Sequence, residues 1–269
     1  MRHPCPRLAL LAGGALLCLS AQAHRPWLLP SATLVDGPAP VVSIDAAISD
    51  DLFEFDSLPL QLETLRVVAP DGRIVEPDGR IEAKRRISFD VELAQEGTYR
   101  IAGVTDTTVA SWKAGGQARR WRGALAALAS AVPADAQDLQ VTRQLARAET
   151  FVSHATPGPP PAAITGEGLE LQPLTSPTDL SVGDASRFRV LLDGRPFANA
   201  DVTLIRGGNR YRYKMGELAL KTDAAGEFGV AWPEAGRWWL GINHGDRAQG
   251  GAAPARRESY SATFEVLPK

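Results

Sequence analysis

The residues best suited to chemistry in this sequence are its histidines, and His24 follows a stretch typical of a cleaved export signal. Arg2 and Arg7 flank the start of an apolar run, and residues 21–23 (Ala-Gln-Ala) place small side chains where a signal peptidase requires them. Cleavage after residue 23 would make His24 the first residue of the mature protein. Its free α-amine and its ring Nδ1 would then form a chelate ring on a metal ion. The alternative is a histidine that is at this position by accident and is merely solvated.

A second imidazole would complete a T-shaped site of three nitrogens, a ligand arrangement that suits Cu(II). The mature chain has two further histidines, His154 and His244. His244 ends an expected strand at a loop, where side chains can converge on a site. We therefore predict a metal site of His24 and His244, with His154 as the other candidate ligand, that prefers Cu(II) to Ni(II) or Co(II). The alternative for both is a hydrogen bond at the end of a strand or helix.

Composition indicates an exported protein without disulfides. Removing residues 1–23 leaves 246 of the 269 residues, with 27 Lys and Arg against 31 Asp and Glu, so no basic excess points to nucleic acid. Both cysteines, Cys5 and Cys18, lie inside the signal. Lipid attachment at Cys18 is the alternative to cleavage, but Leu17 stands where a lipoprotein signal has a small residue. Because no other apolar run is long enough to span a membrane, we expect a periplasmic protein.

Residues 24–115 show the pattern of a β-sandwich. Residues 87–93 alternate apolar and polar side chains, and the turn dipeptides at 71–72 and 78–79 (both Asp-Gly) separate short strands. The acidic stretch 50–56 carries four carboxylates and two phenylalanines. It could bind a cation through oxygen ligands, but its spacing is not that of a calcium loop. We expect a solvated loop whose phenylalanines pack on the sandwich.

The pattern changes over residues 116–165, where we predict a helical insert. Residues 121–132 are rich in alanine and leucine, and residues 138–152 have near-helical spacing. A proline-rich linker at 157–161 then marks the domain boundary. Residues 166–269 contain several short strands separated by turns, which is typical of an immunoglobulin-like or prealbumin-like sandwich. The expected fold is therefore mainly β, with two β-sandwich domains, 24–115 and 166–269, and a short helical insert between them.

Several segments together resemble one family. They are residues 23–30 (Ala-His-Arg-Pro-Trp-Leu-Leu-Pro), 166–170 (Gly-Glu-Gly-Leu-Glu), 193–196 (Asp-Gly-Arg-Pro), 222–226 (Thr-Asp-Ala-Ala-Gly), 236–240 (Gly-Arg-Trp-Trp-Leu) and 258–266 (Glu-Ser-Tyr-Ser-Ala-Thr-Phe-Glu-Val). Over nearly the whole mature chain the sequence is similar to the domain-of-unknown-function 4198 family. That family is labelled a periplasmic component of cobalt or nickel uptake, which implies metal handling and an inner-membrane metal transporter as partner. One departure is Arg25, where members often have an acidic or amide residue.

Catalytic motifs give little support to an enzyme. The sequence has no serine nucleophile elbow, Walker loop, His-Glu-x-x-His or dinucleotide-binding glycine pattern. Three functions remain in view: a periplasmic metal-binding or delivery protein, a binding module without metal, and a histidine-brace copper oxidase of polysaccharides. Trp238 and Trp239 are adjacent on an expected strand, so they face opposite sides, and we expect at least one of them in the core. We favour the metal-binding protein and expect no catalytic activity.

Overall fold

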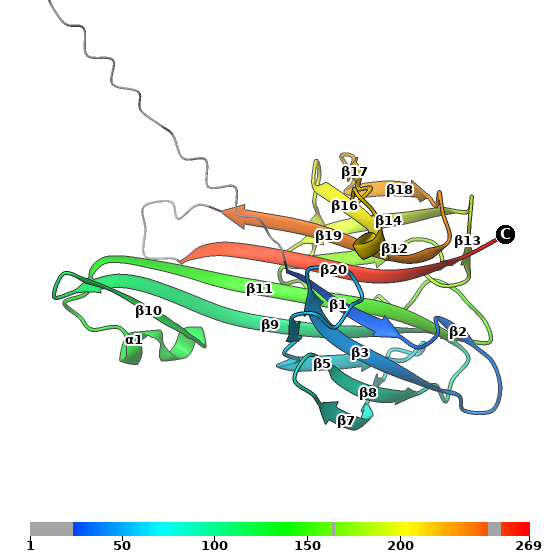
Figure 1. Cartoon of the computed structure of the whole chain (residues 1–269), viewed down its shortest axis with the longest axis horizontal. Helices are drawn as coiled ribbons and strands as arrows, with labels where there is room; N and C mark the ends of the chain where they lie inside the picture. Colours follow the sequence, from blue (N-terminus) through cyan, green and yellow to red (C-terminus); the bar gives the residue numbers. More distant parts are fainter. Residues whose placement is uncertain (1–23, 163–164, 247–253) are drawn as a thin grey trace, which may run out of the picture.

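A computed structural model describes residues 24–162, 165–246 and 254–269, and strands make up most of this part of the chain (Figure 1). The first sheet has strand order β1 (Arg25–Pro30), β3 (Val41–Ser49), β8 (Ile87–Glu92) and β7 (Asp78–Glu82), with β4 (Leu58–Pro59) beside β3. A third, small sheet has the order β12 (Leu169–Pro173), β14 (Ala185–Leu192) and β15 (Arg195–Pro196), with β18 (Glu227–Ala231) beside β14.

The second sheet, which we call the long sheet, has eleven strands and connects both halves of the chain. Its order is β17 (Leu218–Lys221), β16 (Asp201–Arg206), β19 (Gly236–Asp246), β20 (Ala255–Leu267), β11 (Gln137–His154), β9 (Gly97–Ala114), β5 (Thr64–Val68) and β6 (Ile74–Val75). Three shorter strands attach to this path: β10 (Gln117–Gly123) to β9, β13 (Leu180–Ser181) to β20, and β2 (Leu34–Val35) to β11.

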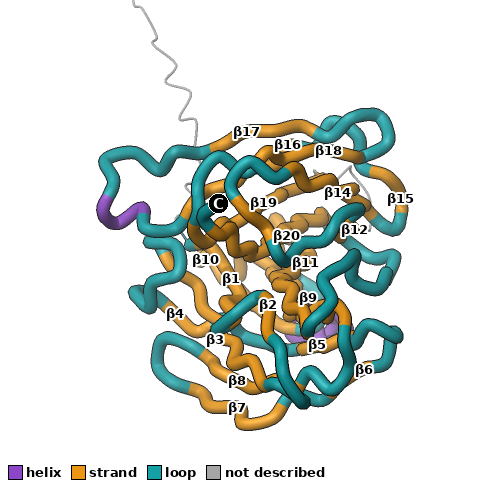
Figure 2. The backbone as a smooth tube through the Cα atoms, turned by 90° about the vertical axis from the view of Figure 1, so that its right-hand side faces the viewer, coloured by secondary structure: helices purple, strands orange, loops and turns teal. Residues whose placement is uncertain are grey.

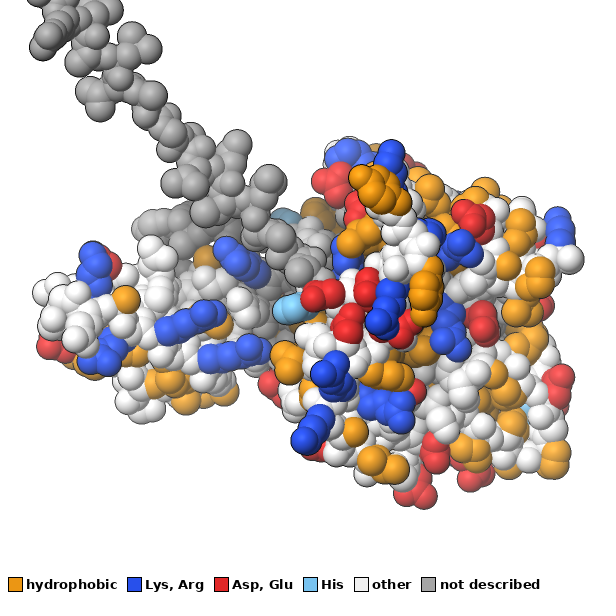
Figure 3. Space-filling view, viewed as in Figure 1, with side chains coloured by type: hydrophobic (Ala, Val, Ile, Leu, Met, Phe, Trp, Pro, Cys, Tyr) orange, Lys and Arg blue, Asp and Glu red, His pale blue; other side chains and the backbone are white. Residues whose placement is uncertain are grey.

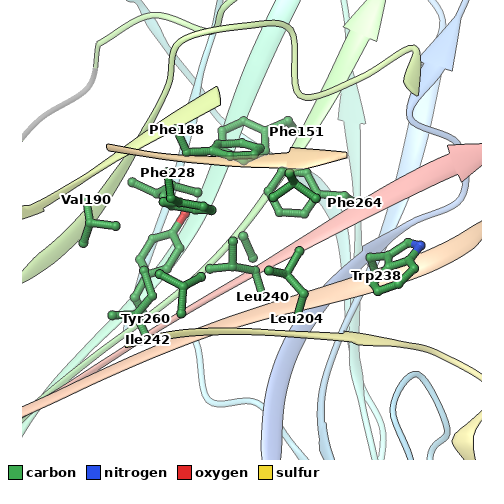
Figure 4. Packing of buried hydrophobic residues seen from close by; sticks show 14 of the residues in the cluster. Phe151, Phe188, Val190, Leu204, Phe228, Trp238, Leu240, Ile242, Tyr260 and Phe264 are labelled. Atoms are coloured by element: carbon green, nitrogen blue, oxygen red, sulfur yellow. The ribbon is translucent and has the colours of Figure 1, made fainter. Parts of the chain in front are cut away.

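The first and third sheets pack on opposite faces of the long sheet and so form two sandwiches, as the layers in Figure 2 illustrate. The side chains of β11 show this directly. Val152 lies in the core of the first sandwich, with residues of β1, β3 and β8, whereas Phe151 lies in the core of the second, with residues of β12, β14 and β18. In the second core, Phe188 packs against Phe228 and Phe264, with ring centroids 5.3 Å apart in each case (Figure 4). The predicted fold class, mainly β with two sandwiches, is confirmed.

The predicted helix over 138–152 is wrong, because these residues lie in β11. β11 pairs antiparallel with β9 and parallel with β20, and both of its faces are covered from Leu145 onward. A strand buried on both faces has no alternating pattern, so its apolar spacing resembles that of a helix. Of the predicted helix over 121–132, only η1 (Leu125–Ala127) and α1 (Leu128–Ala131) are helical, and Trp121 lies in β10.

The proline-rich segment 157–161, the predicted domain boundary, lies between the end of β11 and the start of β12. The long sheet nevertheless crosses that boundary, so the sandwiches share hydrogen-bonded strands in addition to a linker. Beyond the sandwiches, β9, β10 and β11 extend as an arm that carries α1 (Figure 1). Among the described residues, no helix has the length and apolar character needed to cross a membrane.

Candidate functional site

His24 is the first described residue and directly precedes β1. Because β1 pairs antiparallel with β3, with Arg25 opposite Ser49, the residue after Ser49 comes to lie beside His24. The ring Nδ1 of His24 lies 2.6 Å from Oδ1 of Asp50, and the two side chains are 57% and 58% exposed. A carboxylate only accepts, so the Nδ1–H donates to it. Strand register therefore brings the predicted metal ligand beside the acidic stretch, a contact that the residue types alone do not reveal.

The acidic stretch is held in place by its neighbours. The Asp56 carboxylate accepts hydrogen bonds from the backbone N–H of Asp50 (3.2 Å) and of Asp51 (3.0 Å). Phe53 and Phe55 pack on Trp27, with ring centroids 5.7 and 5.6 Å away, as expected from the sequence. This anchoring fixes the Asp50 carboxylate against His24, although the contact itself lies at the surface.

Phe53 and Trp27 belong to a third apolar cluster that joins the two sandwiches. It also contains Ile205 of β16 and Trp239 of β19, whereas Trp238 lies in the core of the second sandwich. The two tryptophans thus face opposite sides of the long sheet, and both are buried. The cluster places the start of β1 against β19 and so positions His24 at a groove between the sandwiches.

This groove encloses about 500 Å³. It is lined by His24, Arg25, Pro26, Glu217 and residues of β16, β19 and β20. The Arg25 guanidinium lies 3.3 Å from the Met215 sulfur, 3.9 Å from the Glu217 carboxylate and 5.8 Å from the centre of the Trp239 ring. Glu217 thus partly compensates the positive charge of Arg25. In Figure 3, acidic and basic side chains gather where the sandwiches meet.

The structure does not bring His244 to His24. Asn243 lines the groove with His24, and His244, the next residue of β19, projects from the other face of the sheet. There its ring packs edge-on against Phe197, with centroids 5.0 Å apart, and it lies opposite Glu258 of β20. The three-nitrogen arrangement with His244 therefore does not form within the described residues.

His154 lies at the C-terminal end of β11, away from the groove. It is buried, and its Nε2 donates to the carbonyl oxygen of Gly37 at 2.8 Å. This matches the alternative expected for a histidine at a strand end. Among the described residues, no group of three or more His, Cys, Asp or Glu side chains could hold a metal ion. A metal site at His24 therefore needs a donor in addition to side chains. That donor would be the α-amine of His24, which is free only after cleavage.

Around His244 the structure instead forms an ionic cluster. The Arg256 guanidinium contacts both Asp193 and Glu258. Its hydrogen bonds hold the pKa of Asp193 at about 2, whereas burial raises the pKa of Glu258 above its usual range despite the same cation. Ionisation of Asp193 therefore stabilises the folded state, whereas ionisation of Glu258 destabilises it.

This difference gives a prediction for pH. A carboxyl group with a raised pKa in the folded state contributes stability that is present at low pH and is lost as the pH rises through the folded-state pKa. We expect Glu258→Gln to raise the thermal midpoint relative to the native chain, by an amount that increases from about pH 4 to about pH 8. Asp193 has a lowered pKa, so its contribution is present above its ordinary pKa and is lost as the pH falls. Asp193→Asn should therefore lower the midpoint near neutrality. A pH-independent effect of Glu258→Gln would contradict this interpretation.

Comparison with known proteins identifies one matching family and several remotely similar structures. A family model described as "Domain of unknown function (DUF4198)" matches residues 21–246. No curated protein sequence matches the chain. The structure is similar to trypsin-activated alpha-2-macroglobulin from Escherichia coli (16% identity, TM-score 0.24, 89% of this chain and 15% of that one). It is also similar to a DUF4785 family protein from Legionella pneumophila (10% identity, TM-score 0.27, 83% of this chain and 52% of that one). A further similar structure is the D0-D1 domain of intimin (11% identity, TM-score 0.21, 88% of this chain and 97% of that one). The chain thus spans only a small part of the macroglobulin, and similarity at this level says nothing about function.

Proposed function

The chain belongs to the DUF4198 family, and on this premise we propose that it is an exported protein that binds one transition-metal ion at His24. We propose Cu(II) as the preferred metal, ahead of Ni(II) and Co(II), following the affinity order of nitrogen sites. The observation that carries the proposal is the contact of 2.6 Å between the His24 Nδ1 and the Asp50 Oδ1.

The donors would be the α-amine of His24, the Nδ1 of His24 and the carboxylate of Asp50. Metal–nitrogen and metal–oxygen bonds of about 2.0–2.2 Å place neighbouring ligands at right angles roughly 2.9 Å apart. The observed spacing of 2.6 Å is close to this value, so little movement is needed when a metal replaces the shared proton. Three donors of nitrogen and carboxylate type fit Cu(II) or Ni(II) chemically.

The position of the donors favours transfer of the metal over permanent storage. Both side chains are more than half exposed, so an incoming ligand can reach the site without unfolding of the surrounding sheet. A buried structural metal would instead be enclosed by its ligands and their hydrogen bonds. We therefore propose a role in uptake or delivery in the periplasm, with an inner-membrane metal transporter as the partner that receives the ion.

The test is calorimetric titration of Cu(II) into protein that begins at His24. We expect one site per chain, no measurable binding by His24→Ala, and a loss of at least about 100-fold for Asp50→Asn, more than the roughly 10- to 100-fold that follows removal of a group that only supports a metal ligand. His154→Ala and His244→Ala serve as matched controls and should retain the native affinity, because both rings lie away from the groove.

Native affinity in the His24→Ala variant would exclude the proposed site. If the native protein does not bind Cu(II) at all, the favoured function becomes that of a binding module without metal, in agreement with the groove beside β1. Native affinity in Asp50→Asn alone would remove Asp50 from the donor set and leave His24 as the chelating residue.

A further inference from the structure

The arm that extends beyond the two sandwiches adds nothing to a hydrophobic core. It consists of residues 111–141, which comprise the outer parts of β9 and β11 and all of β10, η1 and α1. None of these residues is fully buried. Gly115 and Gly116 join β9 to β10, and their φ angles of 56° and 76° suit the two-residue turn of a tight hairpin. The arm is therefore a well-defined ribbon whose side chains remain available to another molecule.

The arm is basic, whereas the rest of the mature chain is acidic. The arm has four Lys and Arg residues against two Asp residues, and the remainder has 23 Lys and Arg against 29 Asp and Glu. One of the two arm carboxylates, Asp138, is paired with Lys113 at 2.7 Å. The three arginines of β10 are exposed, and none has an acidic partner within the described part of the chain: Arg119, Arg120 and Arg122.

Strand register places two of these arginines on one face of the arm. Arg120 and Arg122 are two positions apart on β10, so their side chains point to the same side. The residues opposite them on β9, Ser111 and Val109, are uncharged, and so are the next residues across on β11. In Figure 3, basic side chains lie along the arm with apolar side chains beside them. The arm thus presents a row of cations among uncharged neighbours.

An apolar segment follows these arginines directly. Residues 124–132 (Ala-Leu-Ala-Ala-Leu-Ala-Ser-Ala-Val) carry no charge and contain η1 and α1. Neither helix has a fully buried residue, and Leu125 is 43% exposed. Leu139, at the outer end of β11, is 45% exposed. Exposed apolar surface rimmed by polar residues marks a site of interaction with a protein or a membrane.

The composition of this surface favours a membrane over a protein partner. Protein interfaces are depleted in alanine and depend on large side chains that fill pockets, whereas segment 124–132 is mostly alanine. A lipid surface is fluid and requires only apolar side chains next to basic ones. An apolar segment and a basic patch together supply the two contributions that stable membrane anchoring needs.

We propose that the arm binds an anionic phospholipid membrane, with its arginines on the lipid phosphates and segment 124–132 inserted among the headgroups. The guanidinium group suits this role because its donors match the geometry of phosphate oxygens. The arm then holds the sandwiches at the membrane, where the transporter of the proposed function lies. Membrane binding involves no metal, so the inference is independent of the site at His24.

The test is co-sedimentation of protein that begins at His24 with vesicles of phosphatidylglycerol and phosphatidylethanolamine. We expect binding that weakens as salt is added, and no binding to vesicles of phosphatidylcholine alone. Each basic residue near an anionic surface contributes about fivefold, so the double variant Arg120→Gln with Arg122→Gln should bind about 25-fold more weakly. Leu125→Gln should bind about fivefold more weakly, because less apolar surface enters the headgroup region.

The matched control is Arg195→Gln with Arg237→Gln, which removes the same charge from exposed positions outside the arm and should leave vesicle binding unchanged. All of these side chains are exposed or half-exposed, so the variants should keep the native thermal midpoint. The variant without Arg120 and Arg122 should also bind Cu(II) as the native protein does.

Three outcomes would overturn the inference. Equal losses in the two double variants would show general charge attraction without a site, and native binding by the variant without Arg120 and Arg122 would exclude the basic face. Failure of the native protein to bind the anionic vesicles would exclude the membrane and leave an acidic protein as the partner of the arm. Vesicle binding by protein that does not bind Cu(II) would overturn the proposed function alone.

Discussion

Protein that begins at His24 should bind Cu(II) at least about 100-fold more tightly than protein that retains Ala23 or a tag before it. An added residue converts the α-amine to an amide, which has no basic lone pair, so the chelate ring is lost. The effect should exceed the roughly 10- to 100-fold that follows loss of a group that only supports a ligand. Calorimetric titration of the two forms at the same pH measures it.

The pH dependence provides a second readout for the same comparison. Amines and imidazoles must be unprotonated to bind a metal, so the affinity of the processed form should fall steeply between about pH 8 and about pH 6. The extended form should lose less over this range because it has no amine to protonate. His24→Ala, prepared in both forms, is the control and should show no difference between them. Equal affinities of the two native forms would eliminate the chelate.

The sequence predicted the fold class because most strands are buried on one face only. Strand β8 is the clearest example: Ile87, Phe89 and Val91 are buried and alternate with less buried residues. Strand β11 could not be recognised in this way, because neighbours on both faces remove the alternation. The continuous long sheet was also missed, since the parallel pairing of β11 with β20 joins residues more than one hundred positions apart.

The candidate site was predicted in part. His24 and the acidic stretch were each recognised from residue types, but their contact depends on the pairing of β1 with β3. A prediction of that register would have placed Asp50 beside His24. The choice of His244 failed for a more local reason: residues of one strand alternate between faces, and Asn243 is the residue that faces the groove.

The largest effect on stability is expected from Glu149, a buried carboxylate of β11. It accepts hydrogen bonds from Arg100 of β9 at 3.0 and 3.3 Å, from Arg147 at 3.3 Å and from the Tyr260 hydroxyl of β20 at 2.7 Å. Arg100 also donates to the carbonyl oxygen of Leu171 in β12, at 3.1 Å. Burial, together with this carboxylate, raises the pKa of Tyr260 well above its usual range, so its hydroxyl remains a donor. The cluster therefore ties the long sheet to the third sheet.

Replacing Glu149 by alanine would leave the buried guanidinium of Arg100 without its carboxylate partner and would leave Arg147 with Glu170, 3.4 Å away, as its remaining carboxylate. Breaking a buried pair in this way costs about 3–5 kcal/mol, so we expect urea denaturation to show a loss of this size in the free energy of unfolding. Asp201→Asn is the matched control, because its ion pair with Lys221 is exposed and should change stability by less than about 1 kcal/mol. In the double variant Arg100→Met with Glu149→Met, much of the loss should be recovered, since apolar side chains need no counter-charge. A loss of less than about 1 kcal/mol in Glu149→Ala would show that water or a shifted carboxylate replaces Glu149, and that the cluster does not hold the sandwiches together.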